Sequence, residues 1–138
     1  MIKRNKLPEG IAERLDLLKP LLERDQRVVF AYLFGGLASG VQRPLSDVDI
    51  AVYLDNCRHK AEVKLELIGT VSDALGTDEI DLLILNDAPV SLAGRILKNR
   101  RLLVDRLPFL RHAFESRVMR EFFDFSRKEQ DILFRRFA

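Results

Sequence analysis

Two aspartates, Asp47 and Asp49, stand one residue apart at the start of an apolar segment that ends at Leu54. Side chains at positions i and i+2 of a strand point to the same face, so a strand here projects both carboxylates together. Neighbouring carboxylates repel each other unless a cation lies between them, and oxygen ligands suit Mg²⁺ or Mn²⁺. The pair therefore predicts a divalent metal site. The alternative is a solvated strand start in which Ser46 and Asp47 form a turn.

A third carboxylate, Asp81, interrupts an apolar run that extends from Ile80 to Leu85. Burying a carboxylate is costly unless it is paired or bound to a metal. If its strand lies beside that of Asp49, about 4.8 Å away, Asp81 completes a cluster of three carboxylates. The alternatives are a salt bridge between Asp81 and an arginine, or Asp78 or Glu79 in its place nearer the turn.

Two glycines, Gly35 and Gly36, end an apolar segment just upstream of the aspartates. Glycine lets backbone N–H groups approach an anion closely, so the pair predicts a phosphate cradle, which Ser39 and Arg43 extend. The stretch is neither a Walker A loop nor a Gly-x-Gly-x-x-Gly dinucleotide fingerprint. A metal site beside a phosphate cradle indicates phosphoryl or nucleotidyl transfer. The alternatives are a simple turn at the glycines and a surface position for Arg43.

The elements that position these residues follow from the apolar spacing. Apolar residues at helical spacing predict helices over residues 8–24, 60–75 and 89–99, and from 108 almost to the end. Continuous apolar runs predict strands over residues 27–34, 47–54, 78–85 and 102–104. Pro20 is expected to kink or shorten the first helix, and Gly76 to end the second. This alternation predicts an α/β or α+β fold with a mixed sheet. We expect a single domain over residues 1–138, with a catalytic core at about 27–85 and a helical tail at about 108–138.

Composition narrows the class of protein. Apolar residues make up 47% of the chain, which indicates a folded globular protein, and the net charge of +2 does not mark a nucleic-acid binder. Cys57 is the only cysteine, which excludes an internal disulfide framework and a cysteine zinc site, and a reducing, cytoplasmic setting fits. No apolar run approaches the roughly 20 residues that span a bilayer, and no signal peptide is expected.

The segment after Pro108 carries more apolar surface than one packing face needs. Seven of the nine phenylalanines lie there, and an i, i+4 stripe comprises Leu110, Phe114, Val118 and Phe122. From Arg100 to Ala138, ten Lys and Arg stand against six Asp and Glu. We therefore expect part of this helix to meet a partner or a second copy. The alternative is core packing with a solvated basic face.

The order of these motifs resembles the minimal nucleotidyltransferase (MNT) family of the polymerase-β superfamily. Its pattern of Gly-Ser, about ten residues, Asp-x-Asp and a later third carboxylate is matched here by Gly35-Gly36, ten residues, Asp47-Val48-Asp49 and Asp81. The match is specific over about residues 34–55 and extends to about 85. Gly36 departs from the pattern, because the family usually has serine there, and this removes a hydroxyl but keeps the backbone N–H.

The resemblance implies a polymerase-β-like fold, a mixed sheet with helices on one side and a C-terminal helical tail. It implies two Mg²⁺ ions, or Mn²⁺, with catalytic and metal-binding roles for Asp47, Asp49 and Asp81. It implies ATP as the substrate, held by Gly35, Gly36, Ser39 and Arg43. AMP would move to a hydroxyl, commonly a tyrosine of a HEPN-type toxin, an all-helical ribonuclease whose antitoxin is the MNT protein.

Two other functions stay open on the sequence alone. A binding module could neutralise its partner by occlusion, which Gly36 in place of serine favours. A nucleotidyltransferase of the antibiotic-modifying kind would act on a small molecule such as an aminoglycoside. For nucleotidyl transfer we expect the acceptor to be supplied by a partner or to be small, because the chain is too short to add a dedicated domain that grips a primer or tRNA. We expect no nucleic-acid substrate and no membrane attachment, and a homo-oligomer is compatible with the sequence.

Overall fold

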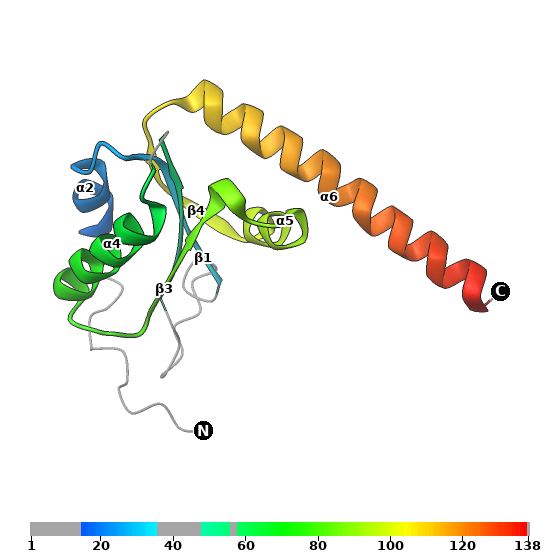
Figure 1. Cartoon of the computed structure of the whole chain (residues 1–138), viewed down its shortest axis with the longest axis horizontal. Coiled ribbons are helices and arrows are strands. Elements are labelled where there is room, and N and C mark those ends of the chain that lie inside the picture. The colour runs from blue at the N-terminus through cyan, green and yellow to red at the C-terminus, as the bar shows by residue number, and fades with distance from the viewer. Residues whose placement is uncertain (1–14, 36–47, 56–57, 138) are drawn as a thin grey trace.

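A computed structural model of the chain describes residues 15–35, 48–55 and 58–137, with side chains as far as residue 133. The elements follow in the order α2 (Leu18–Glu23), β1 (Val28–Phe34), β2 (Val48–Leu54), α4 (Lys60–Leu75), β3 (Ile80–Ile84), the 3₁₀ turn η1 (Leu85–Asp87), α5 (Val90–Lys98), β4 (Arg100–Asp105) and α6 (Pro108–Phe137) (Figure 1). Helices and strands alternate as the apolar spacing predicts.

The four strands form one mixed sheet in the order β3-β2-β1-β4. β1 pairs antiparallel with both β2 and β4, whereas β2 pairs parallel with β3. The parallel pair requires a long connection, which α4 provides between β2 and β3. The predicted fold class, an α+β domain with a mixed sheet and a C-terminal helix, is confirmed.

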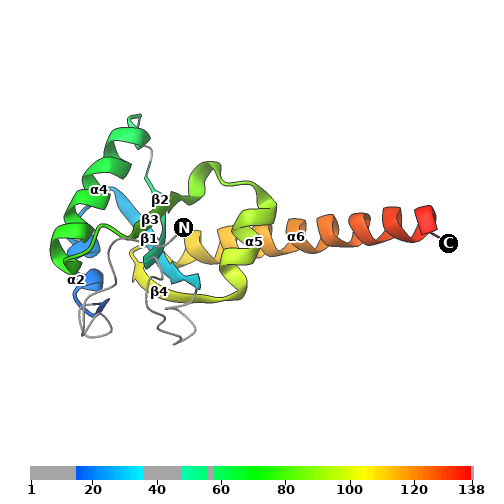
Figure 2. The same cartoon turned by 90° about the horizontal axis from the view of Figure 1, so that it is seen from below.

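Helices cover both faces of the sheet, so the expected arrangement with helices on one side is wrong in this detail (Figures 1 and 2). α2 and α4 pack on one face, and α5 with the first half of α6 packs on the other. The reason lies in β1, whose alternating Ala31 and Leu33 face one core while Phe30 and Tyr32 face the other. A strand that is apolar on both sides requires cover on both sides.

Local sequence signals end and interrupt the helices as expected. The predicted first helix is interrupted by a turn at residues 16–17, and α2 restarts at Leu18. Pro20 therefore lies in the first turn of α2, where its missing N–H leaves no helical hydrogen bond unmade. Gly76 ends α4 with φ 69°, a left-handed conformation that glycine adopts at low cost.

β4 is longer than predicted and begins at Arg100 rather than residue 102. Arg100 and Arg101 do not belong to an apolar run, so the sequence pattern misses the first two residues of this edge strand. The predicted third strand ends earlier than expected, because Leu85 already belongs to η1. Both differences concern strand ends, where pairing with a neighbour decides the boundary.

A hydrogen-bonded ion network fixes the first half of α6 on the sheet. Tyr32 of β1 donates its hydroxyl to Glu115 Oε2 at 2.7 Å, and Arg111 donates to Glu115 Oε1 at 2.9 Å. Arg111 also pairs with Asp105 at 3.0 Å, and Arg100 with Glu115 at 3.1 Å. Burial, reinforced by Glu115, raises the pKa of Tyr32 far above its ordinary value, so the phenol stays protonated.

The predicted stripe on α6 is confirmed for three of its four members. Phe114, Val118 and Phe122 are buried against the sheet and α5, whereas Leu110 is 38% exposed. Gly94 of α5 lets the two helices meet, because a Cβ at this position would lie 2.0 Å from the Phe122 ring. None of the helices described combines the length and the apolarity that a membrane crossing requires.

Candidate active site

The described candidate residues lie along the edge of the sheet at which the strands begin or end. β1 ends there at Phe34 and Gly35, and β2 begins there, because the register places Phe34 opposite Asp49. β3 also begins at this edge, since it runs parallel to β2. β4 begins there as well, with Arg100 opposite Phe34. Four strand ends that are distant in sequence thus meet at one place.

Asp49 and Asp81 are direct partners in the parallel pairing of β2 with β3. Neighbouring strands lie about 4.8 Å apart and paired residues point to the same side, so the two carboxylates are neighbours. Asp49 is half-buried and Asp81 is exposed. Within the described part of the chain no lysine or arginine forms an ion pair with Asp81, so the salt-bridge alternative has no support there.

Two adjacent carboxylates at a solvent-accessible edge suit a hard divalent cation, because their oxygens match its ligand preference and its charge relieves their repulsion. Asp49 shares its sheet face with Ala51, which packs in the core beneath α5 and α6. Because both carboxylates supply oxygen ligands, the residues present fit a metal. Among the described residues alone, no group of three acidic, histidine or cysteine side chains is placed to hold a metal ion.

Gly35 lies against the Asp49 carboxylate. Its φ of 73° is a left-handed conformation, and an added Cβ would lie 2.4 Å from Asp49 Oδ2. Only glycine combines this backbone conformation with room for the carboxylate. The end of β1 thus lies directly against the side chain of the candidate metal ligand.

Asp47, Gly36, Ser39 and Arg43 lie outside the described residues, so their predicted roles stay predictions. The two alternative third ligands, Asp78 and Glu79, precede β3. Glu79 accepts the N–H of Val48 through its backbone carbonyl at 2.8 Å, which brings the start of β3 to the start of β2. Asp81, and neither alternative, has the register position opposite Asp49.

Asn99 is a residue at this edge that the sequence patterns did not indicate. It follows the last turn of α5, and its side-chain Nδ2 donates to the Gly35 carbonyl at 3.3 Å. Arg100, the next residue, pairs with Glu115 and lies over the Tyr32 ring. Two neighbouring residues thus connect the glycine turn with α6. A polar residue at a helix end was the sole available signal, and it does not predict a partner so distant in sequence.

Comparison with protein families gives one match, to "Polymerase beta, Nucleotidyltransferase", over residues 17–108. This range is more than half of the chain and includes every described strand of the sheet. A search of curated proteins gave no match.

Several solved structures share the fold. A chain from a variant of the toxin–antitoxin complex MntA–HpeT is 25% identical, with a TM-score of 0.69, and the match covers 90% of this chain and 98% of that one. A toxin–antitoxin structure with AMP-PNP is 24% identical, with a TM-score of 0.69 and coverage of 91% and 98%.

A third structure, the tri-AMPylated HEPN toxin of Shewanella oneidensis in complex with its MNT antitoxin, matches at 21% identity. Its TM-score is 0.63, with coverage of 91% of this chain and 96% of that one. The resemblance to minimal nucleotidyltransferases is thereby confirmed in the fold. By the family match over residues 17–108 and the architecture that surrounds Asp49 and Asp81, the chain belongs to the polymerase beta nucleotidyltransferase family.

Proposed function

We propose that this protein is a metal-dependent nucleotidyltransferase that moves AMP from ATP to a tyrosine hydroxyl of a HEPN-type toxin, and so acts as the antitoxin. The observation that carries the proposal is the pairing of Asp49 with Asp81 beside the left-handed Gly35. The fold shared with a toxin–antitoxin structure that contains AMP-PNP, and with the complex of an AMPylated HEPN toxin, supports the nucleotide and the acceptor.

In this proposal Asp49 and Asp81, together with Asp47, would hold two Mg²⁺ or Mn²⁺ ions. The bound cations would supply charge stabilisation for the reacting phosphate and its leaving group. Gly35 and Gly36 would present backbone N–H groups to the triphosphate, and Ser39 and Arg43 would extend this cradle. Gly35 additionally keeps the end of β1 close enough to Asp49 for phosphate and carboxylate to share one site.

The transfer is a displacement at the α-phosphorus of ATP. The acceptor oxygen forms a bond to that phosphorus, the bond from the phosphorus to the oxygen that bridges to the β-phosphate breaks, and pyrophosphate leaves. The hydroxyl proton passes to the carboxylate of Asp81, which is exposed and can reach an acceptor from outside the sheet. Asp49 is more enclosed and would serve as a fixed ligand.

A protein acceptor fits the shape of the chain. The sheet edge is open at Asp81, and α6 extends past the sheet with exposed apolar side chains. These features suit a macromolecular partner. A cytoplasmic location belongs to this proposal, because ATP and the toxin's RNA substrate are found there.

The test is a transfer assay with ATP labelled on the α-phosphate. The protein is incubated with Mg²⁺ and the purified HEPN toxin, and the Asp47→Asn/Asp49→Asn variant is the control. We expect label on the toxin with the unmodified protein, and a loss of both label and neutralisation with the variant. Mass spectrometry then locates AMP on the modified residue.

A second candidate, neutralisation by binding alone, is favoured by the exposed apolar half of α6. It predicts that the Asp47→Asn/Asp49→Asn variant still binds and neutralises the toxin. Tight complex formation with intact neutralisation and no label would therefore reject the transferase and support occlusion.

A further inference from the structure

The second half of α6 projects beyond the domain. The helix runs from Pro108 to Phe137, and Phe122 is the last of its described side chains that is buried (Figures 1 and 2). Beyond that point Phe125 is 45% and Ile132 63% exposed. Most helices of this length in water depend on packing of an apolar face, so a projecting apolar segment indicates a missing partner surface.

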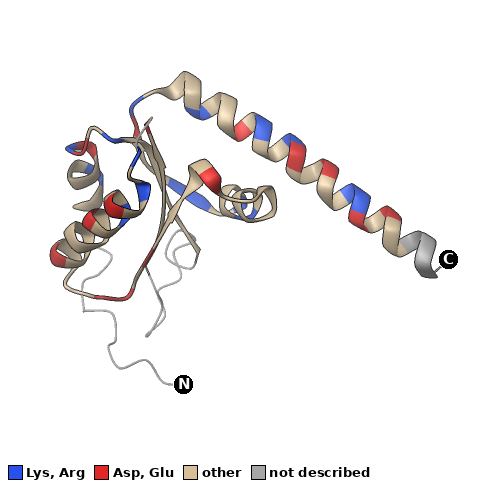
Figure 3. Cartoon of the chain, in the orientation of Figure 1, with Lys and Arg blue, Asp and Glu red and all other residues tan. Residues whose placement is uncertain are grey.

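Five of the exposed side chains share one side of the helix. Their spacing of i, i+3, i+4, i+7 and i+11 places them within a single stripe, which runs beside the buried one. We call this stripe the docking face; it comprises Glu121, Asp124, Phe125, Lys128 and Ile132. Figure 3 shows the alternation of acidic and basic residues along this part of α6.

A surface cavity of about 290 Å³ lies in the docking face. Glu121, Asp124, Phe125 and Lys128 line it from α6, and Val90 lines it from the first turn of α5. The cavity therefore has an apolar wall, formed by Phe125 and Val90, and a rim with two carboxylates and one ammonium. Such a site suits a long cationic side chain, whose charge pairs with the carboxylates while its planar or aliphatic part packs on the ring.

We propose that the docking face binds the toxin, and that a toxin arginine or lysine enters the cavity between α5 and α6. This inference rests on the proposed function, which it deepens by naming the surface. A ribonuclease presents basic side chains to its polyanionic substrate, so an acidic rim complements it. Arginine is also enriched among the residues that dominate interface energies.

Charge also distinguishes the toxin from a second copy of this chain. In a two-fold dimer formed through the docking face, the same patch meets itself, so two rims that each carry two carboxylates and one ammonium face each other with net charges of the same sign. A basic partner instead attracts these carboxylates, so the electrostatic interaction becomes favourable. The docking face therefore favours the toxin as its occupant, and self-association is an outcome that the experiment detects.

The experiment compares Phe125→Ser with Phe123→Ser. Both are exposed phenylalanines of α6, two residues apart and therefore on opposite sides of the helix. With immobilised wild-type toxin, we expect Phe125→Ser to weaken binding by about thirtyfold, the loss typical of a dominant interface residue. Phe123→Ser should change the affinity less than about threefold, and circular dichroism should show equal helicity for both variants.

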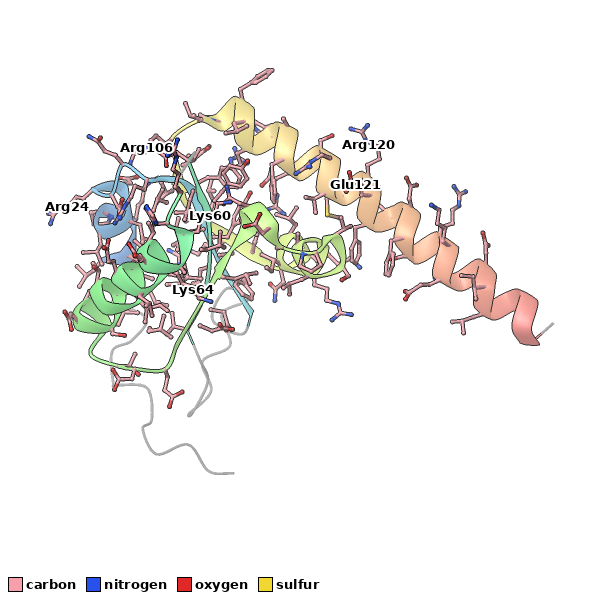
Figure 4. All side chains as sticks on the ribbon, in the orientation of Figure 1. Arg24, Lys60, Lys64, Arg106, Arg120 and Glu121 are labelled. Carbon is pink, nitrogen blue, oxygen red and sulfur yellow. The ribbon has the colours of Figure 1, made fainter. Side chains whose placement is uncertain are left out.

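A second pair of variants tests the charged rim of the cavity. Glu121→Lys/Asp124→Lys should slow association with the toxin and reverse the effect of salt on the association rate, because the attraction is replaced by repulsion, which salt screens. Arg120→Glu is the control, since Arg120 points away from the domain (Figure 4) and lies outside the docking face. It should leave both quantities near the wild-type values.

The outcomes separate this inference from the proposed function. Toxin binding that Phe125→Ser and Phe123→Ser weaken equally, or not at all, overturns the docking face and leaves the antitoxin role intact. No binding by the unmodified chain overturns both. A chain that is dimeric by light scattering, and that becomes monomeric with Phe125→Ser, overturns the toxin as occupant and assigns the face to a second copy.

Discussion

Gly35 and Asp49 are in direct contact: a Cβ at position 35 would lie 2.4 Å from Oδ2 of the Asp49 carboxylate. The contact joins the end of β1 to the start of β2, which are register neighbours in the sheet. A candidate metal ligand therefore depends on a residue with no side chain, and this dependence leads to the first prediction.

Gly35→Ala should abolish nucleotidyl transfer, to below about 1% of the unmodified rate, because Asp49 must move away from its position. It should also lower the free energy of unfolding by roughly 1–3 kcal/mol, since alanine is strained at φ 73°. Gly69→Ala is the matched control: it lies within α4, meets nothing within 4 Å, and should stabilise by about 0.5–1 kcal/mol. Labelled-ATP turnover and urea denaturation measure the two effects.

Asp81→Asn separates catalysis from stability. We expect transfer to fall by at least about a hundredfold, because the variant loses a charged ligand and the proton acceptor. Without metal, thermal unfolding should occur at the same or a higher temperature, because the repulsion between positions 49 and 81 disappears. Asp78→Asn, an exposed change before β3, should retain full activity. Undiminished activity and Mn²⁺ binding in Asp81→Asn would exclude this residue from the site.

Gly94 and Phe122 set the distance between α5 and α6. Gly94→Ala should lower the free energy of unfolding by about 1–3 kcal/mol, because its Cβ would overlap the Phe122 ring at 2.0 Å. Phe122→Ala should cost about 3–5 kcal/mol through the cavity that it leaves. In the double variant the new methyl occupies part of that cavity, so the combined loss should be smaller than the sum. Simple additivity in chemical denaturation would show that the two residues do not compete for this space.

Tyr32→Phe tests the network that anchors α6. The change removes one hydroxyl from a fully buried ring and deprives the Glu115 carboxylate of its 2.7 Å hydrogen bond. We expect the free energy of unfolding to fall by about 1–2 kcal/mol. Tyr53→Phe is the comparison: no described side chain accepts a hydrogen bond from that hydroxyl, so the loss should stay below about 0.5 kcal/mol. Equal effects of the two changes would mean that the network contributes no stability.

The ion pair of Asp25 with Arg27 makes the free energy of unfolding depend on pH in the acid range. Arg27 donates from Nε to Oδ1 at 2.9 Å and from Nη2 to Oδ2 at 2.7 Å, and this bond lowers the pKa of Asp25 in the folded chain. Because the folded pKa lies below the unfolded value of about 3.9, the bond stabilises the fold above that pH. The stabilisation disappears as the pH falls through the folded pKa.

Asp25→Asn should therefore lower the free energy of unfolding at pH 7 and make it fall less steeply below about pH 4 than in the unmodified chain. Urea denaturation at pH 7, 4 and 3 measures both effects. Asp73→Asn, an exposed change on α4, serves as the comparison. If Asp25→Asn and the unmodified chain lose stability in parallel below pH 4, Asp25 does not contribute to the acid dependence.

Local patterns predicted most of the elements. The periodicity of Val63, Leu67, Val71 and Leu75 defines α4, and Gly76 ends it; both signals act within a few residues of the chain. The positions of Asp49 and Asp81 at strand starts were also predictable, because apolar runs follow each of them. The start of β4 was not, because Arg100 and Arg101 become part of a strand only by pairing with β1.

The charge of the C-terminal region is also a property that the sequence alone does not predict correctly. The sequence has an excess of basic residues after residue 100, but several of these arginines are used within the domain. Arg100 and Arg111 bind Glu115, and Arg106 donates to the backbone carbonyl of Val28. The exposed docking face then has two carboxylates and one lysine around its cavity. A count along the chain cannot distinguish basic residues that are paired from those that meet solvent.

The residue pattern alone predicts the chemistry that we propose for the site: two aspartates at i and i+2, a third before an apolar run, and a glycine pair upstream. These features are local, and their spacing is set by the backbone period of a strand. The tertiary structure alone decided that Asp81 lies opposite Asp49, that helices cover both sheet faces, and that α6 continues past its packing partners. Each of these depends on contacts between segments distant in the chain, which periodicity does not encode.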